Sequence, residues 1–156
     1  MTIDAPLSRY KKQNLMIAIA VMIGLGIWFY YDGHYNEKFI EKHTIVDEDG
    51  NERRNSTLAF NRKTPPILFV GAGFVAVYFF VIRNKKVTAD ETGLTANGKT
   101  IEYKDIELIN KTYFDTKGYF VVGYKDPQGN SCQMKLSDRT YDNLKTVLDH
   151  LVAKIS

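Results

Sequence analysis

Two apolar runs stand out from an otherwise polar chain of 156 residues, one at residues 15–31 and the other at residues 67–82. Neither run contains Asp, Glu, Lys or Arg. At a rise of about 1.5 Å per residue, each run crosses most of a hydrocarbon layer about 30 Å thick. Uncharged residues 64–66 extend the second run. The pattern therefore predicts transmembrane helices at residues 14–32 and 66–83, with buried helices of a soluble core as the alternative.

The ends of the two runs favour a membrane over a soluble core. Trp28, Tyr30 and Tyr31 close the first run, and further aromatic residues close the second. Amphipathic rings suit the lipid headgroup boundary, so we expect these three side chains to contact headgroups. A cleaved signal peptide is a second alternative for the first run, but the bulky rings stand where cleavage needs small residues. We therefore predict an uncleaved anchor.

Basic residues beside the runs predict the orientation of the chain. Those before the first run and after the second are Lys11, Lys12, Arg83, Lys85 and Lys86. Only Arg62 and Lys63 lie next to the runs on the other side. Because basic residues near span ends favour the cytoplasm, we expect residues 1–13 to form a cytoplasmic tail and residues 33–65 an extracytoplasmic loop. The expected location is the inner membrane of a cell, with both termini cytoplasmic.

Small residues recur at a four-residue spacing in both runs. They are Ala20 and Gly24 in the first run, and Ala72 and Ala76 in the second. Such positions let two helices approach closely within lipid. We expect them to pack the two spans as a hairpin, and a contact with a second copy of the chain is the alternative.

The residues from 87 to 156 show the pattern of a folded domain. Asn97 and Gly98 mark a tight turn between two strands, since both tolerate positive φ. Further strands are predicted at residues 107–113, 119–124 and 131–136. After Ser137, a predicted N-cap, the apolar period changes from two to about 3.6. The residues on the apolar face are Tyr141, Leu144, Leu148, Leu151 and Ile155. The expected fold class is therefore α+β, with two transmembrane helices followed by an antiparallel sheet and a C-terminal helix.

Three motifs of this domain resemble a known family. The stretch Asp90–Leu94, then Asn97-Gly98, then Ile101–Ile106 resembles the opening of bacterial pleckstrin-homology-like (PH-like) domains on small membrane proteins. The resemblance implies a curved sheet or partial barrel, capped by a C-terminal helix and joined to the membrane, and it supplies no catalytic residues. Eukaryotic relatives that bind phosphoinositides use several basic residues around a longer first hairpin loop. Here only Lys99 lies beside that turn.

Charge and chemistry exclude several classes of function. The formal net charge of +3 is spread along the chain, and no segment is basic enough to indicate nucleic acid. The single cysteine, Cys132, cannot form an internal disulfide, and the three histidines show no zinc spacing. No nucleophile elbow, phosphate-binding glycine loop or dinucleotide fingerprint occurs. We therefore expect no catalytic residues, no metal, no cofactor and no enzymatic activity.

A membrane anchor joined to a folded module predicts an interaction protein. We expect a non-catalytic module that binds a membrane protein partner or self-assembles at the cytoplasmic face. The alternative is a module that binds anionic lipid or organises the membrane, with headgroup contacts from Lys85, Lys86, Lys99 and Lys104. Carboxylates lie close to these lysines in the sequence, which favours the protein partner.

Overall fold

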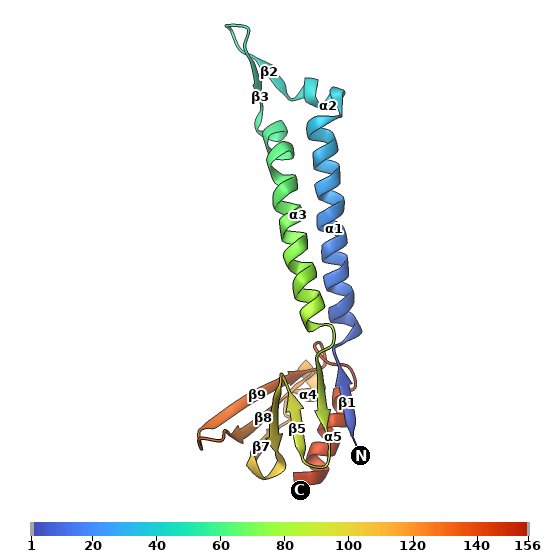
Figure 1. The fold of residues 1–156 in the computed structure, drawn as a ribbon, viewed down its shortest axis with the longest axis vertical. Helices are drawn as coiled ribbons and strands as arrows, with labels where there is room; N and C mark the ends of the chain where they lie inside the picture. Colours follow the sequence, from blue (N-terminus) through green and yellow to red (C-terminus); the bar gives the residue numbers. More distant parts are fainter. Residues whose placement is uncertain (1, 156) are drawn as a thin grey trace. The chain divides into compact units, whose positions relative to one another are not determined.

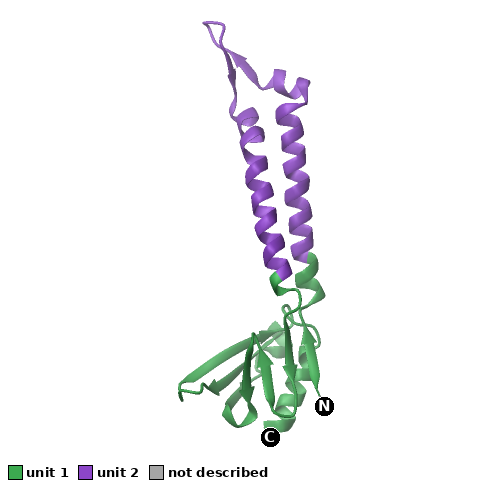
Figure 2. Ribbon diagram, viewed as in Figure 1, with its two compact units in different colours: residues 1–13, 81–156 green, residues 14–80 purple. Residues whose placement is uncertain are grey.

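The computed structural model describes residues 2–155, which form two compact units (Figure 2). The hairpin unit runs from Asn14 to Phe80. The sheet unit is made of the residues up to Gln13 together with those from Val81 onward. The chain therefore contributes to the sheet unit twice, once before and once after the hairpin unit.

The hairpin unit is built on two long helices, α1 (Arg9–His34) and α3 (Ser56–Ile82) (Figure 1). Within the described residues, these two are long and apolar enough to cross a membrane. A core helix of a soluble protein is mostly buried, whereas only 6% and 17% of their most apolar windows are buried. Large apolar side chains such as Ile17 and Phe74 are 59% and 73% exposed, which suits lipid surroundings.

Helix α3 begins at Ser56, so the predicted start at residue 66 is wrong. Asn55 caps the helix, because its side-chain Oδ1 accepts a hydrogen bond from the Leu58 N–H at 2.9 Å. Pro65 and Pro66 lie inside the helix rather than at its start. A proline lacks the N–H that a helix interior normally uses, so neither residue donates a main-chain hydrogen bond within the helix. The loop expected to extend to residue 65 is therefore shorter.

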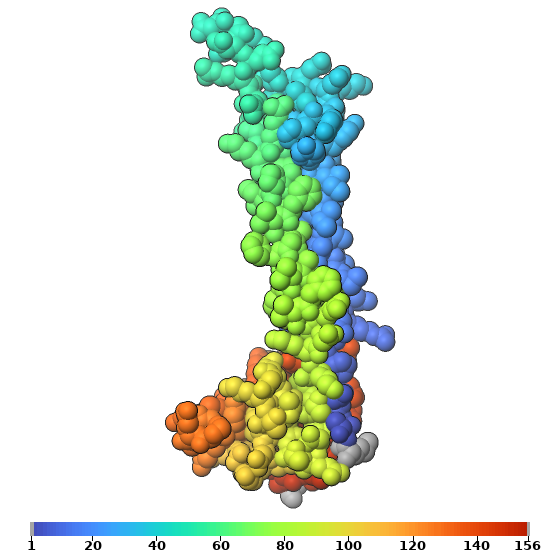
Figure 3. Space-filling view, viewed as in Figure 1, coloured from blue at the N-terminus to red at the C-terminus, as the bar shows by residue number. Residues whose placement is uncertain are grey.

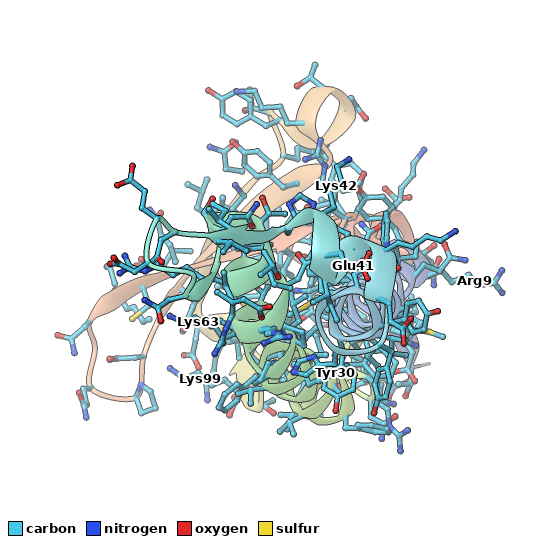
Figure 4. The ribbon with its side chains drawn as sticks, turned by 90° about the horizontal axis from the view of Figure 1, so that it is seen from above. Arg9, Tyr30, Glu41, Lys42, Lys63 and Lys99 are labelled. Atoms are coloured by element: carbon cyan, nitrogen blue, oxygen red, sulfur yellow. The ribbon has the colours of Figure 1, made fainter. Side chains whose placement is uncertain are left out.

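The segment between the two long helices has its own local structure. It holds the short helix α2 (Glu37–Lys42), whose Glu41 and Lys42 are labelled in Figure 4, and the strands β2 (Thr44–Val46) and β3 (Glu52–Arg54). Asp47 shapes the turn between these strands, because its Oδ1 accepts hydrogen bonds from the N–H groups of Asp49 and Asn51. The result is a small antiparallel hairpin.

The small residues expected at the helix contact divide into two groups. Ala72 is buried and Ala76 is half-buried. Ala20 and Gly24 are exposed, and among the described residues nothing lies within 4 Å of the point where a Gly24 Cβ would stand. These two therefore do not pack the hairpin, which corrects that expectation. A contact of theirs with a second copy of the chain stays a prediction.

Two other glycines take their place at the helix contact. A Cβ at Gly26 would lie 2.8 Å from the Phe69 ring, and one at Gly71 would lie 2.5 Å from the Met22 methyl group. Large side chains therefore fill the space opposite each glycine. The space-filling view of Figure 3 shows the atoms of the two helices lying against each other. The sequence spacing alone does not indicate which small residues face the partner helix.

The sheet unit contains two antiparallel sheets, of four and three strands, and not a closed barrel. The first has the order β1 (Ile3–Pro6), β4 (Lys86–Ala89), β5 (Gly93–Ala96) and β6 (Lys99–Glu102). The second has the order β7 (Ile106–Asn110), β8 (Tyr119–Lys125) and β9 (Ser131–Ser137). The 3₁₀ helix η1 (Tyr103–Asp105) joins the sheets, and α4 (Phe114–Lys117) lies between β7 and β8. Asn97 and Gly98 have φ of 53° and 76°, which confirms the predicted turn.

The segment expected as a tail forms strand β1, which corrects the predicted domain boundary at residue 87. β1 pairs antiparallel with β4, and Ala5 lies opposite Val87 with both side chains fully buried. The Leu7 N–H extends the ladder by donating to the Lys85 carbonyl at 3.0 Å. Residues on either side of the hairpin unit are thus neighbours in one sheet.

Helix α5 (Leu144–Ile155) begins later than the predicted N-cap at Ser137. The intervening residues instead bind the start of the chain. The Ser8 N–H donates to the Thr140 carbonyl at 2.8 Å, and the Asp142 N–H donates to the Pro6 carbonyl at 2.9 Å. The buried residues of α5 share one hydrophobic core with the strands, and they are Leu144, Val147, Leu148 and Leu151.

Candidate functional site

The four lysines proposed for headgroup contact have different surroundings. Lys86 pairs with Asp4 at 2.7 Å, and Lys104 pairs with Glu102 at 2.7 Å. The hydrogen bond from Lys86 lowers the pKa of the Asp4 carboxyl. Lys99 lines a cavity of about 270 Å³ whose lining also includes Asp105 and Asp126, and Lys85 is exposed. The positive charge at Lys86 and Lys104 is therefore offset by a paired carboxylate.

The aromatic residues at the end of α1 are accessible. Trp28, Tyr30 and Tyr31 are all exposed. Tyr30, labelled in Figure 4, stacks on His34 with ring centroids 4.5 Å apart, and Tyr31 stacks on Tyr35. Exposed stacked rings at the end of an apolar helix suit a headgroup boundary. Their contact with lipid stays a prediction.

The sheet unit carries two adjoining cavities along α5, one beside β7 and the other beside the segment that runs from the end of β7 into α4. The first, about 250 Å³, is lined by Glu107, Leu108, Ile109, Lys111, Val152 and Ile155. The second, about 450 Å³, is lined by Lys111, Thr112, Phe114, Asp115, Lys145, Leu148 and Asp149. Lys111 belongs to both linings, so the cavities are neighbours along the helix. We call them together the β7–α5 groove.

One wall of the groove is an edge strand. β7 lies at the end of its sheet, and among the described residues only β8 pairs with it. The register with β8 shifts between Ile106 and Leu108, which marks a β-bulge. A bulge turns the following side chains to a new direction, and Leu108 is 59% exposed although Ile106 is buried. The strand thus presents an apolar side chain beside unpaired main-chain groups.

The other wall is the end of α5. Ile155 is 37% exposed and Val152 is half-buried, whereas Leu148 belongs to the core. Charged side chains surround this apolar strip, and they are Glu107, Lys111, Asp115, Lys145 and Asp149. Glu107 is already paired with Lys125 at 3.1 Å. The groove therefore combines an apolar floor with a mixed-charge rim, which suits a peptide more than a reaction centre.

The sequence indicated the parts of this groove but not the groove itself. The helix face with Ile155 and the strand with Leu108 both follow from the apolar pattern. That β7 is an edge strand follows only from the pairing of the sheets. Within residues 2–155, no group of three or more His, Cys, Asp or Glu side chains is placed to hold a metal ion.

Comparisons of the chain with protein-family models, with characterised proteins and with solved structures find no match.

Proposed function

We propose that this protein is a non-catalytic, membrane-anchored PH-like interaction module that binds an extended segment of a protein partner. Two antiparallel sheets with a C-terminal helix in their common core are compatible with a PH-like architecture. The sequence resemblance to bacterial PH-like domains supports the same assignment. The α1–α3 hairpin is the anchor.

The β7–α5 groove is the observation that carries this proposal. An exposed sheet edge binds extended peptides by adding a strand, in which main-chain hydrogen bonds give affinity and alternate side chains give specificity. β7 offers such an edge. Leu108 and Ile155 form an apolar surface beside it, which every second side chain of an added strand would contact. The partner segment is therefore extended, with alternating apolar residues.

The pairing of β1 with β4 supports a topology with both ends on one side. β1 precedes the first apolar helix and β4 follows the second, yet the two strands form one ladder. A chain that crosses a membrane between them must cross it an even number of times. The basic residues Lys11, Lys12 and Lys85 favour the cytoplasm for that side, as in a bacterial inner membrane protein.

Site-specific photo-crosslinking in the full-length chain tests this function. A photoreactive leucine at position 108 is compared with the same residue at Gln133, an exposed position on β9, the other edge strand of the same sheet. We expect one partner protein to crosslink at position 108 and not at position 133. Ile155→Asp should abolish that adduct without changing the circular dichroism of the chain.

One outcome would favour self-assembly over a protein partner, and two would refute the groove. A crosslinked dimer of this chain at position 108 would replace the partner with self-assembly through the same edge. Equal adducts at both positions, or adducts that persist in Ile155→Asp, would refute the groove as the binding site.

A further inference from the structure

A second cavity of the sheet unit is lined by basic residues. It has a volume of about 370 Å³ and is lined by Thr116, Lys117, Tyr119, Lys135, Ser137 and Arg139. Three of these six side chains are cationic, two carry aliphatic hydroxyl groups, and none is a carboxylate. The cavity is separate from the β7–α5 groove, with which it shares no lining residue.

The lysines of this cavity rest on aromatic rings instead of carboxylates. The Lys135 Nζ lies 3.7 Å from the centre of the Tyr119 ring, and the Lys117 Nζ lies 4.6 Å from the centre of the Tyr113 ring. The two rings are themselves stacked, 5.6 Å apart. In the part of the chain that the structure describes, Lys117, Lys135 and Arg139 make no ion pair. Ring faces orient a cation but leave its charge unneutralised.

The fold brings these cations together from three elements. Tyr119 is the first residue of β8 and lies opposite Ser137, the last residue of β9. Lys117 of α4, just before β8, is therefore close to Lys135 on β9 and to Arg139, just after β9. Gly118, with φ of 68°, joins α4 to β8 and accepts a hydrogen bond from the Asp138 N–H at 2.8 Å. The Asp138 carboxylate lies against Gly118 and offsets part of the positive charge. Three cations against this one carboxylate leave a positive site.

Hydrogen bonds connect this cavity to the start of α1. The Ser8 hydroxyl donates to the Arg139 carbonyl at 2.7 Å, and the Arg9 N–H donates to the Asp142 carboxylate at 3.0 Å. Helix α1 starts at Arg9 and its apolar run starts at Leu15, six residues later. The covalent chain therefore keeps this segment within a few residues of the apolar run, whatever the orientation of the sheet unit.

We propose that the cavity formed by Lys117, Lys135 and Arg139 binds the phosphate group of an anionic membrane lipid. Arginine forms paired hydrogen bonds to phosphate oxygens, and lysine supplies compact positive charge beside them. The hydroxyl groups of Thr116 and Ser137 are further donors within the same lining. This site differs from Lys86 and Lys104, which the sequence indicated, because those two lysines are ion-paired with Asp4 and Glu102.

Native mass spectrometry of the full-length chain tests the proposal. The chain is purified in a maltoside detergent and mixed with equal amounts of phosphatidylglycerol and phosphatidylcholine. The variant Lys117→Gln, Lys135→Gln, Arg139→Gln is compared with the control Lys85→Gln, Lys99→Gln, Lys104→Gln, which removes the same amount of positive charge. Since each near-surface cation is worth about fivefold in binding, we expect roughly 100-fold weaker retention of phosphatidylglycerol in the first variant only.

A second arm separates lipid from free phosphate as the source of the anion. Inorganic phosphate at millimolar concentration should leave the retained phosphatidylglycerol in place, because the lipid is also held by its acyl chains. Displacement of the lipid by inorganic phosphate would overturn the lipid assignment in favour of a soluble phosphate. Equal losses in the two variants, or no preference for phosphatidylglycerol in the unchanged chain, would overturn the site. Unchanged amide exchange of β8 in both variants is the control for folding.

Discussion

Replacement of Ala5 by Asp tests whether the residues before the first apolar helix belong to the folded domain. Ala5 is fully buried in the hydrophobic core and lies opposite Val87 on β4. Its neighbour Asp4 points to the other face of the strand, where it is ion-paired with Lys86. Ala5→Asp therefore places a carboxylate in the core, whereas Asp4→Ala changes the exposed face of the same strand.

The size of the effect follows from the cost of burying an unpaired polar group, about 2 to 7 kcal/mol. The lower figure alone corresponds to about a 30-fold change in an equilibrium, since about 1.4 kcal/mol is tenfold. β1 should relieve this cost by leaving the sheet, which exposes the edge of β4 and the hydrogen bond between Leu7 and Lys85. Asp4→Ala removes only the exposed ion pair with Lys86, which solvent screens, so it should have a much smaller effect.

Hydrogen–deuterium exchange of the full-length chain in detergent measures this difference. The β4 (Lys86–Ala89) amides that donate to β1 should exchange at least about 30-fold faster in Ala5→Asp and close to the unchanged rate in Asp4→Ala. The β4 amides that donate to β5 should change less. The amides of α1 within the apolar run serve as an internal control. Unchanged β4 exchange in Ala5→Asp would refute the assignment of β1 to the sheet. Equal acceleration in both variants would refute the placement of Ala5 in the core and of Asp4 on the exposed face.

Three further expectations follow from the same structure. Leu151→Ala should cost about 2 to 5 kcal/mol of unfolding free energy because Leu151 is fully buried, whereas Ile155→Ala at the exposed end of α5 should cost clearly less, and equal thermal shifts would contradict this. The side chain and N–H of Asn130 lower the pKa of Asp126. Because the pKa is lower in the folded state, the ionised Asp126 stabilises the domain at pH values above its unfolded pKa, and this stabilisation is lost as the pH falls through the folded pKa. The acid-induced loss of stability below about pH 4 should therefore be smaller in Asp126→Asn. In a Cys132→Ser background, Glu48→Cys should react with an impermeant maleimide added to intact cells and Lys145→Cys should not, and the reverse pattern would invert the proposed topology.

Local patterns of the sequence determined the elements of this protein. Two uncharged runs defined the long apolar helices, because every backbone group within a membrane must be satisfied inside its own segment. Positive φ at Asn97 and Gly98 specified one hairpin turn, and the local pattern specified β8 and β9. The strand expected at residues 107–113 is instead β7, which begins at Ile106 and ends at Asn110. The 3.6 period identified the buried face of α5. Each of these signals is contained in a window of a few residues.

Partners that are distant in the sequence decided the rest. Residues 3–6 have no strong strand pattern of their own, and they become a strand because β4, about 80 residues away, offers a ladder to pair with. The start of α5 is delayed because the residues after Ser137 bind the backbone near Ser8. The groove exists because β7 is left at an edge, and the basic cavity exists because Lys117, Lys135 and Arg139 meet at one end of a ladder. Both candidate sites arise from pairings between strands, which a local pattern of hydrophobic and polar residues does not encode.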